Sequence, residues 1–375
     1  MDRQKTYTCD IIVVTWNKLD YIRQCVESIL RYTEAPCRLI IVDNASDEDT
    51  RRYLAALEGS GAVAIRLIQN DANVGPGKAR NIALRHLDAE YVCFIDSDVV
   101  VTPGWLANMI AVARSSTEIG MVNPSSNNYN QVPPAGMSFY DYARTLAPLK
   151  QEYLEVGHCI SFCMLIKAEV AERIGPLDEG YILALYEDTD YSMKATSAGY
   201  RCVIARGAYV WHYGHGSTSR VKKMDEIAEK NRKRFYQKWG RPLRIFWGCA
   251  APFGSDAFRD ALARSIQLAR EGHYVYFSAR GSAGLTCAAV FTQCGFHEHA
   301  NVHVTWHRGM LFGWFCLWRV LVRRKKGYDI VVTDDRGLAK LTKRLGFLHR
   351  AEAVDASDAA LLSAVSYRKK FEGLR

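Results

Sequence analysis

This 375-residue sequence contains no Cys-x-x-Cys pair, and its 11 cysteines are odd in number and scattered. A secreted protein held together by disulfides normally has an even cysteine count in a shorter chain, so we expect reduced, mostly buried thiols. No apolar run approaches the roughly 20 residues of a transmembrane helix. The first ten residues, MDRQKTYTCD, lack the apolar core of a signal peptide. These absences predict a cytoplasmic protein.

Proline and glycine are also too few, at 10 and 27 residues, for a collagenous or low-complexity protein. The hydrophobic share of 49% is that of a globular protein and excludes a mostly disordered chain. Charge is uneven: residues 241–375 hold 21 Lys and Arg against 11 Asp and Glu, whereas residues 1–240 hold 28 against 29. This change indicates a domain boundary. It predicts either a solvated basic face or a C-terminal part that meets something anionic.

The N-terminal half alternates apolar strands with amphipathic helices. We expect strands at 9–16, 38–46, 64–70 and 91–99, and helices at 18–32, 50–59 and 77–87. The second of these strands ends in polar residues. This alternation predicts parallel βαβ units in a doubly wound sheet, with ligands bound beyond the carboxyl ends of the strands. Residues 123–157 lose the periodicity and are expected to form a long loop with one short helix.

A second alternation begins near residue 243 and predicts a smaller Rossmann-like α/β domain. Its expected strands are 244–250, 273–279, 302–307 and 329–335, and its expected helices are 255–272, 285–295, 311–327, 337–346 and 359–373. We therefore divide the chain into an N-terminal α/β domain (1–221), a helical linker (222–242) and a C-terminal accessory domain (243–375).

Polar and acidic side chains follow the N-terminal strands. Asp96 and Asp98 are two apart in an extended segment, so both carboxylates can face one ligand, and such oxygens suit Mg²⁺ or Mn²⁺. A capped turn is the alternative. Arg80 follows a glycine-containing stretch and can pair with a carboxylate or a phosphate in a bidentate manner. Glu187 and Asp188 begin a helix, and His212 follows an apolar run.

In order, the motifs VVTWNK, IVDNAS, NxGxxxARN, FIDSD, EDTDYSMKATSAGY and VWHYGHGSTS resemble family-2 glycosyltransferases of the GT-A fold, over about residues 9–220. The resemblance implies a metal-dependent, inverting transferase that uses a nucleotide-diphosphate sugar. The fold class is then a GT-A-type Rossmann-like domain followed by a second, smaller Rossmann-like α/β domain. The run LAREGHYVYF in the C-terminal half is loosely similar to the first Rossmann unit of GT-B glycosyltransferases.

The resemblance also implies a role for each motif residue. Asp188 is the catalytic base, with Glu187 as the alternative, and Asp43 reads a uracil or thymine base. The metal ion is Mn²⁺ or Mg²⁺, taken by Asp98 with Asp96 near the ribose, and His212 is a candidate third contact unless it is a satisfied, partly buried histidine. His215 competes with it. The implied nucleotide-sugar site comprises Thr15, Asp43, Asn44, Gly75, Arg80, Asp96, Ser97 and Asp98.

Several neighbours are assigned structural places. Trp16 and Trp211 are expected to be packing residues, and Lys78 and Asp190 are expected at the surface. Four clustered histidines favour a polar strand edge over a metal site: His297, His299, His303 and His307.

The expected donor is a UDP- or dTDP-sugar, and the acceptor is a glycan, a lipid-linked sugar or a peptide. The C-terminal domain is a candidate homodimer surface. Residues 311–326, apolar and then basic, are either a buried Rossmann helix or a peripheral contact with the inner face of a membrane. Nucleic acid is not an expected partner, because no reading motif occurs. The alternative function is a catalytically silent module that binds a nucleotide or a glycan.

Overall fold

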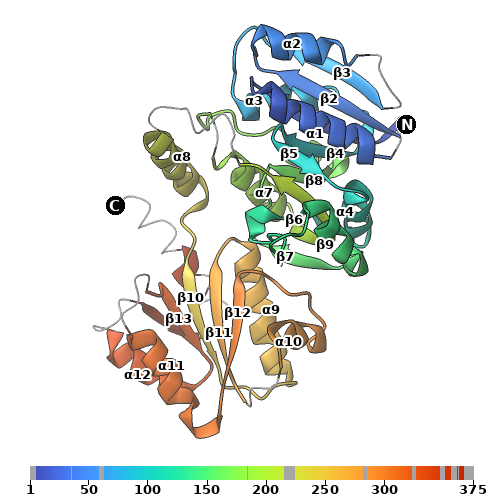
Figure 1. Ribbon diagram of the computed structural model, residues 1–375. Helices are drawn as coiled ribbons and strands as arrows, with labels where there is room; N and C mark the ends of the chain where they lie inside the picture. The colour runs from blue at the N-terminus through green and yellow to red at the C-terminus, as the bar shows by residue number, and fades with distance from the viewer. Residues whose placement is uncertain are drawn as a thin grey trace, which may run out of the picture. The chain divides into compact units, whose positions relative to one another are not determined.

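The computed structural model describes residues 6–34, 36–58, 63–183, 185–214, 224–281, 285–322, 327–346, 351–355, 361 and 363–366. The chain forms two compact α/β units (Figure 1). The first comprises residues 1–153 and 158–232, and the second comprises residues 154–157 and 233–375. The fold class expected from the sequence is confirmed.

The sheet of the first unit is mixed. Its strand order is β3-β2-β1-β4-β8-β6-β9-β5, with β7 off this path. The strands are β1 (Tyr7–Thr15), β2 (Cys37–Asp43), β3 (Ala64–Gln69), β4 (Ala89–Asp96), β5 (Val99–Val101), β6 (Ile119–Ser126), β7 (Tyr153–Val156), β8 (Cys163–Lys167) and β9 (Arg201–His212). Of β7, only Tyr153 is counted in the first unit. The four strands expected to form parallel βαβ units, β1 to β4, are parallel to one another. The whole sheet is mixed because β8 runs antiparallel to β4 and β6, and β5 runs antiparallel to β9.

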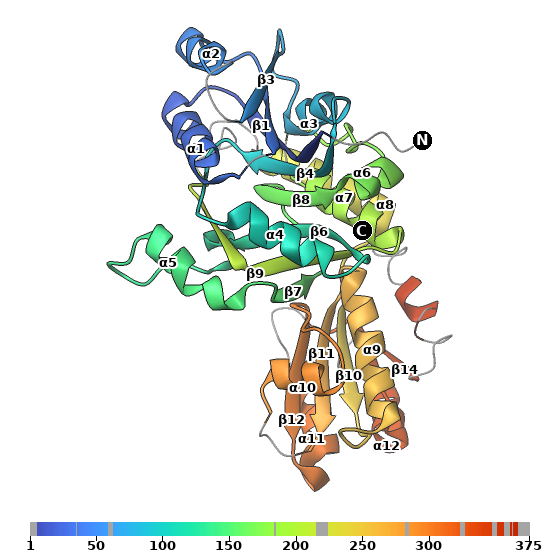
Figure 2. The same cartoon turned by 90° about the vertical axis from the view of Figure 1, so that its right-hand side faces the viewer.

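The helices of this unit follow from periodicity and capping. They are α1 (Leu19–Tyr32), α2 (Glu48–Ala55), α3 (Pro76–Leu84), α4 (Trp105–Arg114), α5 (Phe139–Thr145), α6 (Ala168–Ile174), α7 (Glu187–Ser197) and α8 (Met224–Trp239), with short 3₁₀ turns at Asn127–Tyr129 and Ala147–Leu149. In α1, Ile22, Val26 and Ile29 recur at helical spacing and are buried. Asp47 caps α2 by accepting from the backbone N–H of Thr50. Figure 2 shows α4 lying along β6 and β9.

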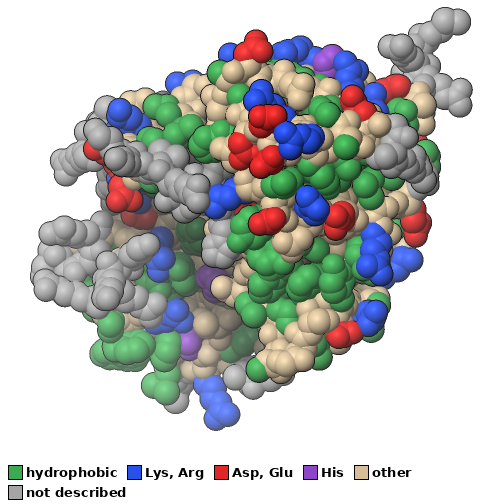
Figure 3. All heavy atoms as spheres, turned by 45° about the horizontal axis from the view of Figure 1, so that its top comes forward, with side chains coloured by type: hydrophobic (Ala, Val, Ile, Leu, Met, Phe, Trp, Pro, Cys, Tyr) green, Lys and Arg blue, Asp and Glu red, His purple; other side chains and the backbone are tan. Residues whose placement is uncertain are grey.

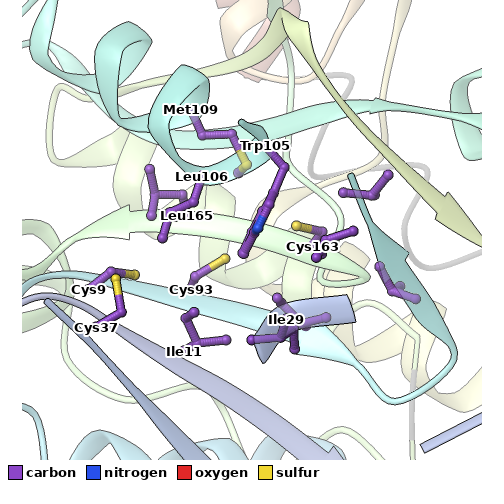
Figure 4. Packing of buried hydrophobic residues seen from close by; sticks show 14 of the residues in the cluster. Cys9, Ile11, Ile29, Cys37, Cys93, Trp105, Leu106, Met109, Cys163 and Leu165 are labelled. Atoms are coloured by element: carbon purple, nitrogen blue, oxygen red, sulfur yellow. The ribbon is translucent and has the colours of Figure 1, made fainter. Parts of the chain in front are cut away.

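The core of the first unit packs aromatic, aliphatic and thiol side chains around the central strands. Figure 4 shows Trp105 and Met109 of α4 with Leu165 of β8 and Cys93 of β4. All eleven cysteines of the two units lie in the described part of the chain and are free thiols. Ten of them are buried, and Cys287 is half-buried. The expectation of mostly buried thiols is confirmed.

The expectation of a long loop over residues 123–157 is only partly correct. Strand β6 continues through Ser126, and β7 begins at Tyr153. The residues 123–126 lack apolar periodicity because Asn123 and Ser125 are buried with hydrogen bonds to backbone carbonyls, including those of Cys163 and Arg206. Buried polar residues that are paired in this way carry no alternating signal in a sequence.

The second unit contains a wholly parallel five-stranded sheet in the order β12-β11-β10-β13-β14. The four strands expected from the sequence are present, and β14 was not expected. The strands are β10 (Arg244–Cys249), β11 (Tyr274–Arg280), β12 (Val302–His307), β13 (Ile330–Thr333) and β14 (Glu352–Asp355). The helices are α9 (Asp256–Arg270), α10 (Cys287–Gln293), α11 (Phe312–Leu321) and α12 (Arg336–Arg344), with a 3₁₀ turn at Gly309–Leu311. Trp247 and Phe258 lie in one core cluster, and Phe246 and Phe312 lie in another, so both faces of the sheet are covered.

Across the described residues, none of the helices is both long enough and apolar enough to cross a membrane.

Candidate active site

Two aspartates and a histidine converge where β4, β5 and β9 meet. Asp96 ends β4, and Asp98 lies in the turn before β5. His212 ends β9 opposite Val99, because β5 pairs with β9 in antiparallel register. One ligand atom from each of Asp96, Asp98 and His212 lies within 4.8 Å of the other two. All three residues were named as candidate metal contacts from the sequence, and the pairing of β5 with β9 explains how the histidine comes beside the two aspartates.

The donor set fits a divalent cation. Asp98 Oδ1 lies 3.1 Å from His212 Nε2. Its other oxygen, Oδ2, is buried and has no hydrogen-bond partner among the described residues. An unpaired buried carboxylate oxygen is costly, and a metal ion would satisfy it. Carboxylate oxygens with one imidazole nitrogen are ligands that Mn²⁺ accepts.

The His212 ring is held from two sides. Its Nδ1 lies 2.8 Å from the side-chain nitrogen of Asn128, and its ring stacks on Phe162 at 5.6 Å between centroids. Burial lowers the pKa of His212, but the hydrogen bond with Asp98 and the nearby carboxylate charges outweigh it and leave that pKa raised. Sequence reasoning missed Asn128, which lies in the stretch expected to be a loop; its only signal is the asparagine-rich run NNYN.

Arg80 is a buried cation fixed between two carboxylates. Its guanidinium donates to Asp96 Oδ1 at 2.8 Å and to Glu187 Oε1 at 3.4 Å, and it lies over the ring of Phe94. Helix α3 places it there, since Gly75 with φ of 82° turns the chain and Pro76 occupies the first helical position.

Glu187 and Asp188 begin α7 and have different environments. Glu187 is buried, and its Oε2 has no hydrogen-bond partner within the described part of the chain. Burial and the charge of Asp188 raise the pKa of Glu187 to about 7, against the opposing effect of Arg80. Asp188 is half-buried, and its two oxygens accept from the backbone N–H groups of Ser161 at 3.1 Å and Thr189 at 2.7 Å.

Asp190 does not lie at the surface as expected. It is fully buried and accepts a hydrogen bond from the Tyr181 hydroxyl at 3.1 Å. The error arises because Tyr181, in the segment that precedes α7, pairs with Asp190, and the sequence pattern of the helix does not record this contact. Lys78 is exposed, as predicted.

Asp43, at the end of β2, is buried next to Thr15 at the end of β1. Thr15 Oγ1 donates to Asp43 Oδ1 at 3.0 Å, and the Ser46 hydroxyl donates to the same oxygen at 2.5 Å. Asp43 has no exposed surface. Its neighbour Asn44 accepts from the Asn70 side chain at 2.9 Å. The carboxylate of Asp43 therefore orients the hydroxyls of Thr15 and Ser46.

A cavity of about 700 Å³ connects these groups. A volume of this size accommodates a ligand of cofactor dimensions. Its lining includes the predicted residues Thr15, Asn44, Arg80, Asp96, Ser97, Asp98, Glu187, Asp188 and His212. Asp43 and Gly75 are not among the described residues that line it.

Of the other residues considered in the sequence analysis, some line the cavity and others do not. Trp16 lines the cavity, whereas Trp211 stacks on Phe139 at 5.9 Å and is not among the lining residues. His158 and Ser161 line it and were missed, since they follow β7 without a motif. His215 lies outside the described residues.

Residues 10–175 match the family model described as Glycosyl transferase family 2. This match confirms the family-2 resemblance over the residues that it covers. Glu187, Asp188 and His212 lie beyond the matched residues.

Two curated relatives of this chain are named for steps of bacterial glycan biosynthesis. The chain is 29% identical over 233 residues to the succinoglycan biosynthesis protein ExoO of Rhizobium meliloti, covering 58% of this chain and 64% of ExoO. It is 26% identical over 205 residues to WfgD of Escherichia coli, named UDP-Glc:alpha-D-GlcNAc-diphosphoundecaprenol beta-1,3-glucosyltransferase, covering 52% of this chain and 76% of WfgD. The chain spans 27% of the length of one matched curated relative and 64% of the length of ExoO.

Among solved structures, the crystal structure of Staphylococcus aureus TarS 1-349 in complex with UDP-GlcNAc aligns with a TM-score of 0.48 and 17% identity. The alignment covers 70% of this chain and 74% of TarS 1-349.

Proposed function

We propose that this protein is a metal-dependent, inverting glycosyltransferase that moves a sugar from a UDP- or dTDP-sugar to an acceptor hydroxyl. The observation that carries the proposal is the Asp96–Asp98–His212 cluster in the same cavity as Glu187 and Asp188. The family-2 match and the name of WfgD, which specifies a UDP-glucose donor, support the donor class. A bacterial glycan or glycoconjugate is the proposed product.

Asp96, Asp98 and His212 would hold the divalent cation, Mn²⁺ or Mg²⁺. When bound, it supplies positive charge beside the diphosphate that leaves the sugar. Arg80 adds a second, permanent positive charge at the same edge of the sheet. Because Arg80 is already held by Asp96 and Glu187, little reorganisation is needed when negative charge develops nearby.

Asp188 is the proposed general base. The acceptor hydroxyl attacks the anomeric carbon from the face opposite the nucleotide, and Asp188 takes its proton. The backbone N–H groups of Ser161 and Thr189 orient the carboxylate toward the cavity. One displacement inverts the anomeric centre, so the chain needs no covalent nucleophile.

Thermal unfolding with UDP, dTDP, GDP or CMP, each with and without Mn²⁺ or Mg²⁺, tests the donor and the metal together. A ligand at about 100 times its Kd adds about 2.7 kcal/mol of stability, which gives a clear rise in Tm. We expect a metal-dependent rise with UDP or dTDP that disappears in Asp98→Asn. The exposed Asp71→Asn is the matched control and should keep the full rise.

Turnover separates an enzyme from a silent binding module. Release of UDP or dTDP from the corresponding sugar nucleotide should require the metal and should be lost in Asp98→Asn. A metal-dependent rise in Tm without any release or transfer, across several acceptors, would favour the binding module instead.

A further inference from the structure

Helix α11 in the second unit presents an apolar stripe to solvent. Its members recur at helical spacing from the 3₁₀ turn to the residue after the helix, so they share one face. The stripe consists of Leu311, Trp314, Phe315, Trp318 and Val322, which are 68%, 74%, 37%, 55% and 37% exposed. We call these five residues the α11 stripe.

The opposite face of α11 already supplies the packing that the fold needs. Phe312, Cys316, Leu317 and Val320 are buried in the core cluster that contains Phe246 of β10. The exposed tryptophans therefore add nothing to that core. A contiguous exposed apolar patch of this kind marks an interaction surface in an otherwise well-packed domain.

Helix α12, which packs against α11, carries charge of one sign. Arg336, Lys340, Lys343 and Arg344 are all exposed, and α12 has no acidic residue. The segment 306–322, which contains the α11 stripe, also has no acidic residue. By contrast, the face shown in Figure 3 mixes basic with acidic side chains.

We propose that the α11 stripe and the cations of α12 form a docking surface for an anionic lipid bilayer. Tryptophan and phenylalanine side chains bury their rings at the boundary between headgroups and acyl chains, while neighbouring lysines and arginines pair with anionic headgroups. The helix lies on the membrane, because its 10 residues are too few to cross it. Asp334 and Asp335 precede α12, but the helix itself carries only basic charge. The combination of exposed tryptophans with these cations favours a lipid surface over a protein partner. This inference is independent of the proposed reaction.

Vesicle sedimentation of the full chain tests the proposal. In about 0.1 M salt, we expect binding to vesicles of phosphatidylglycerol and phosphatidylcholine and at least tenfold weaker binding to phosphatidylcholine alone. The double variant Trp314→Ser/Trp318→Ser should weaken binding at least tenfold. Val132→Ser, which changes an exposed apolar residue of the first unit, is its control and should bind normally.

The charges are tested separately. Lys340→Gln/Lys343→Gln should weaken binding to anionic vesicles about 25-fold, since each cation near the surface contributes about fivefold. The matched control, Arg51→Gln/Arg85→Gln, removes two exposed cations of the first unit and should bind as the unchanged protein does.

A measurement on the unchanged protein tests the proposal even if a variant fails to fold. Brominated phosphatidylglycerol vesicles should quench tryptophan fluorescence, and far less quenching should remain in Trp314→Ser/Trp318→Ser. Absence of quenching and of sedimentation with anionic vesicles would overturn the proposal. So would vesicle binding that both double variants leave unchanged. A stripe that instead drives self-association, with dimers that become monomers in Trp314→Ser/Trp318→Ser and no lipid binding, would overturn it as well.

Discussion

At the scale of single residues, neighbouring carboxylates of α7 differ in what surrounds them. Glu187 Oε1 accepts from Arg80. Burial of the Glu187 carboxyl group raises its pKa to about 7. Asp188 is more exposed, and both of its oxygens accept from backbone N–H groups that fix its orientation. A base must reach the proton that it removes. This difference in exposure is why we propose Asp188 as the base and Glu187 as the residue that positions Arg80.

Conservative variants test this division. Asp188→Asn keeps the shape but removes the base, so we expect kcat to fall about 10²–10⁴-fold while the metal-dependent rise in Tm with nucleotide is retained. Glu187→Gln should reduce kcat much less, because Arg80 keeps its ion pair with Asp96. Single-turnover transfer rates, measured with the nucleotide-induced shift in Tm, check both. The reverse order of effects would assign the base to Glu187.

At the scale of elements, a loop in an unusual backbone conformation leads into α7. Leu183, Leu185 and Tyr186 have φ of 60°, 78° and 75°, and all three line the cavity. Such conformations cost about 1–3 kcal/mol for each non-glycine residue and persist only where other contacts hold them. The buried side chain of Asn231 in α8 does so: it accepts from the N–H of Ile182 at 3.0 Å and donates to the carbonyls of Ile182 and Leu185.

Asn231→Ala should release this loop. The variant removes three partly buried hydrogen bonds to the backbone of this loop, so we expect a loss of about 1–3 kcal/mol in unfolding free energy and a fall in kcat/KM. Urea unfolding and transfer kinetics measure the two effects. Lys230→Ala changes an exposed neighbour on α8 and should affect neither. If Asn231→Ala loses stability but keeps kcat/KM, the loop conformation does not serve the site.

The elements also show where sequence reasoning succeeds and where it fails. Hydrophobic periodicity is local, so it predicted β1, β2 and β4 and the polar residues at their carboxyl ends. The direction of β8 depends on its pairing with β4 and β6, which periodicity does not record. The roles of Asn128 and Asn231 depend on partners tens of residues away, His212 and Ile182, and an isolated asparagine gives no signal of such a partner.

At the scale of the whole molecule, no single boundary in the sequence separates the two units. Residues 154–157 belong to the second unit, between two segments of the first. Glu155 forms a parallel bridge with His299, donating to the Glu298 carbonyl and accepting from the Ala300 N–H. Charge patterning could not reveal this, because the segment is four residues long and its partners are more than 100 residues away.

The buried carboxylate of Glu155 makes this insertion testable. Arg270 donates to both of its oxygens, at 2.8 and 3.1 Å. His299 does not share the charge at pH 7, because burial lowers its pKa to about 4. Arg270→Leu would leave the carboxylate without this cation, and we expect a loss of about 3–5 kcal/mol in the free energy of unfolding.

Adding Glu155→Gln to Arg270→Leu should recover part of that loss, since no uncompensated charge then stays buried. Guanidinium unfolding of the two single variants and the double variant at pH 7 measures the coupling. Gln267→Leu, an exposed change on the same helix, serves as the control. A double variant no more stable than Arg270→Leu would mean that the buried charge is not what makes the loss of Arg270 costly. The segment 154–157 would then be held in the second unit chiefly by its backbone hydrogen bonds.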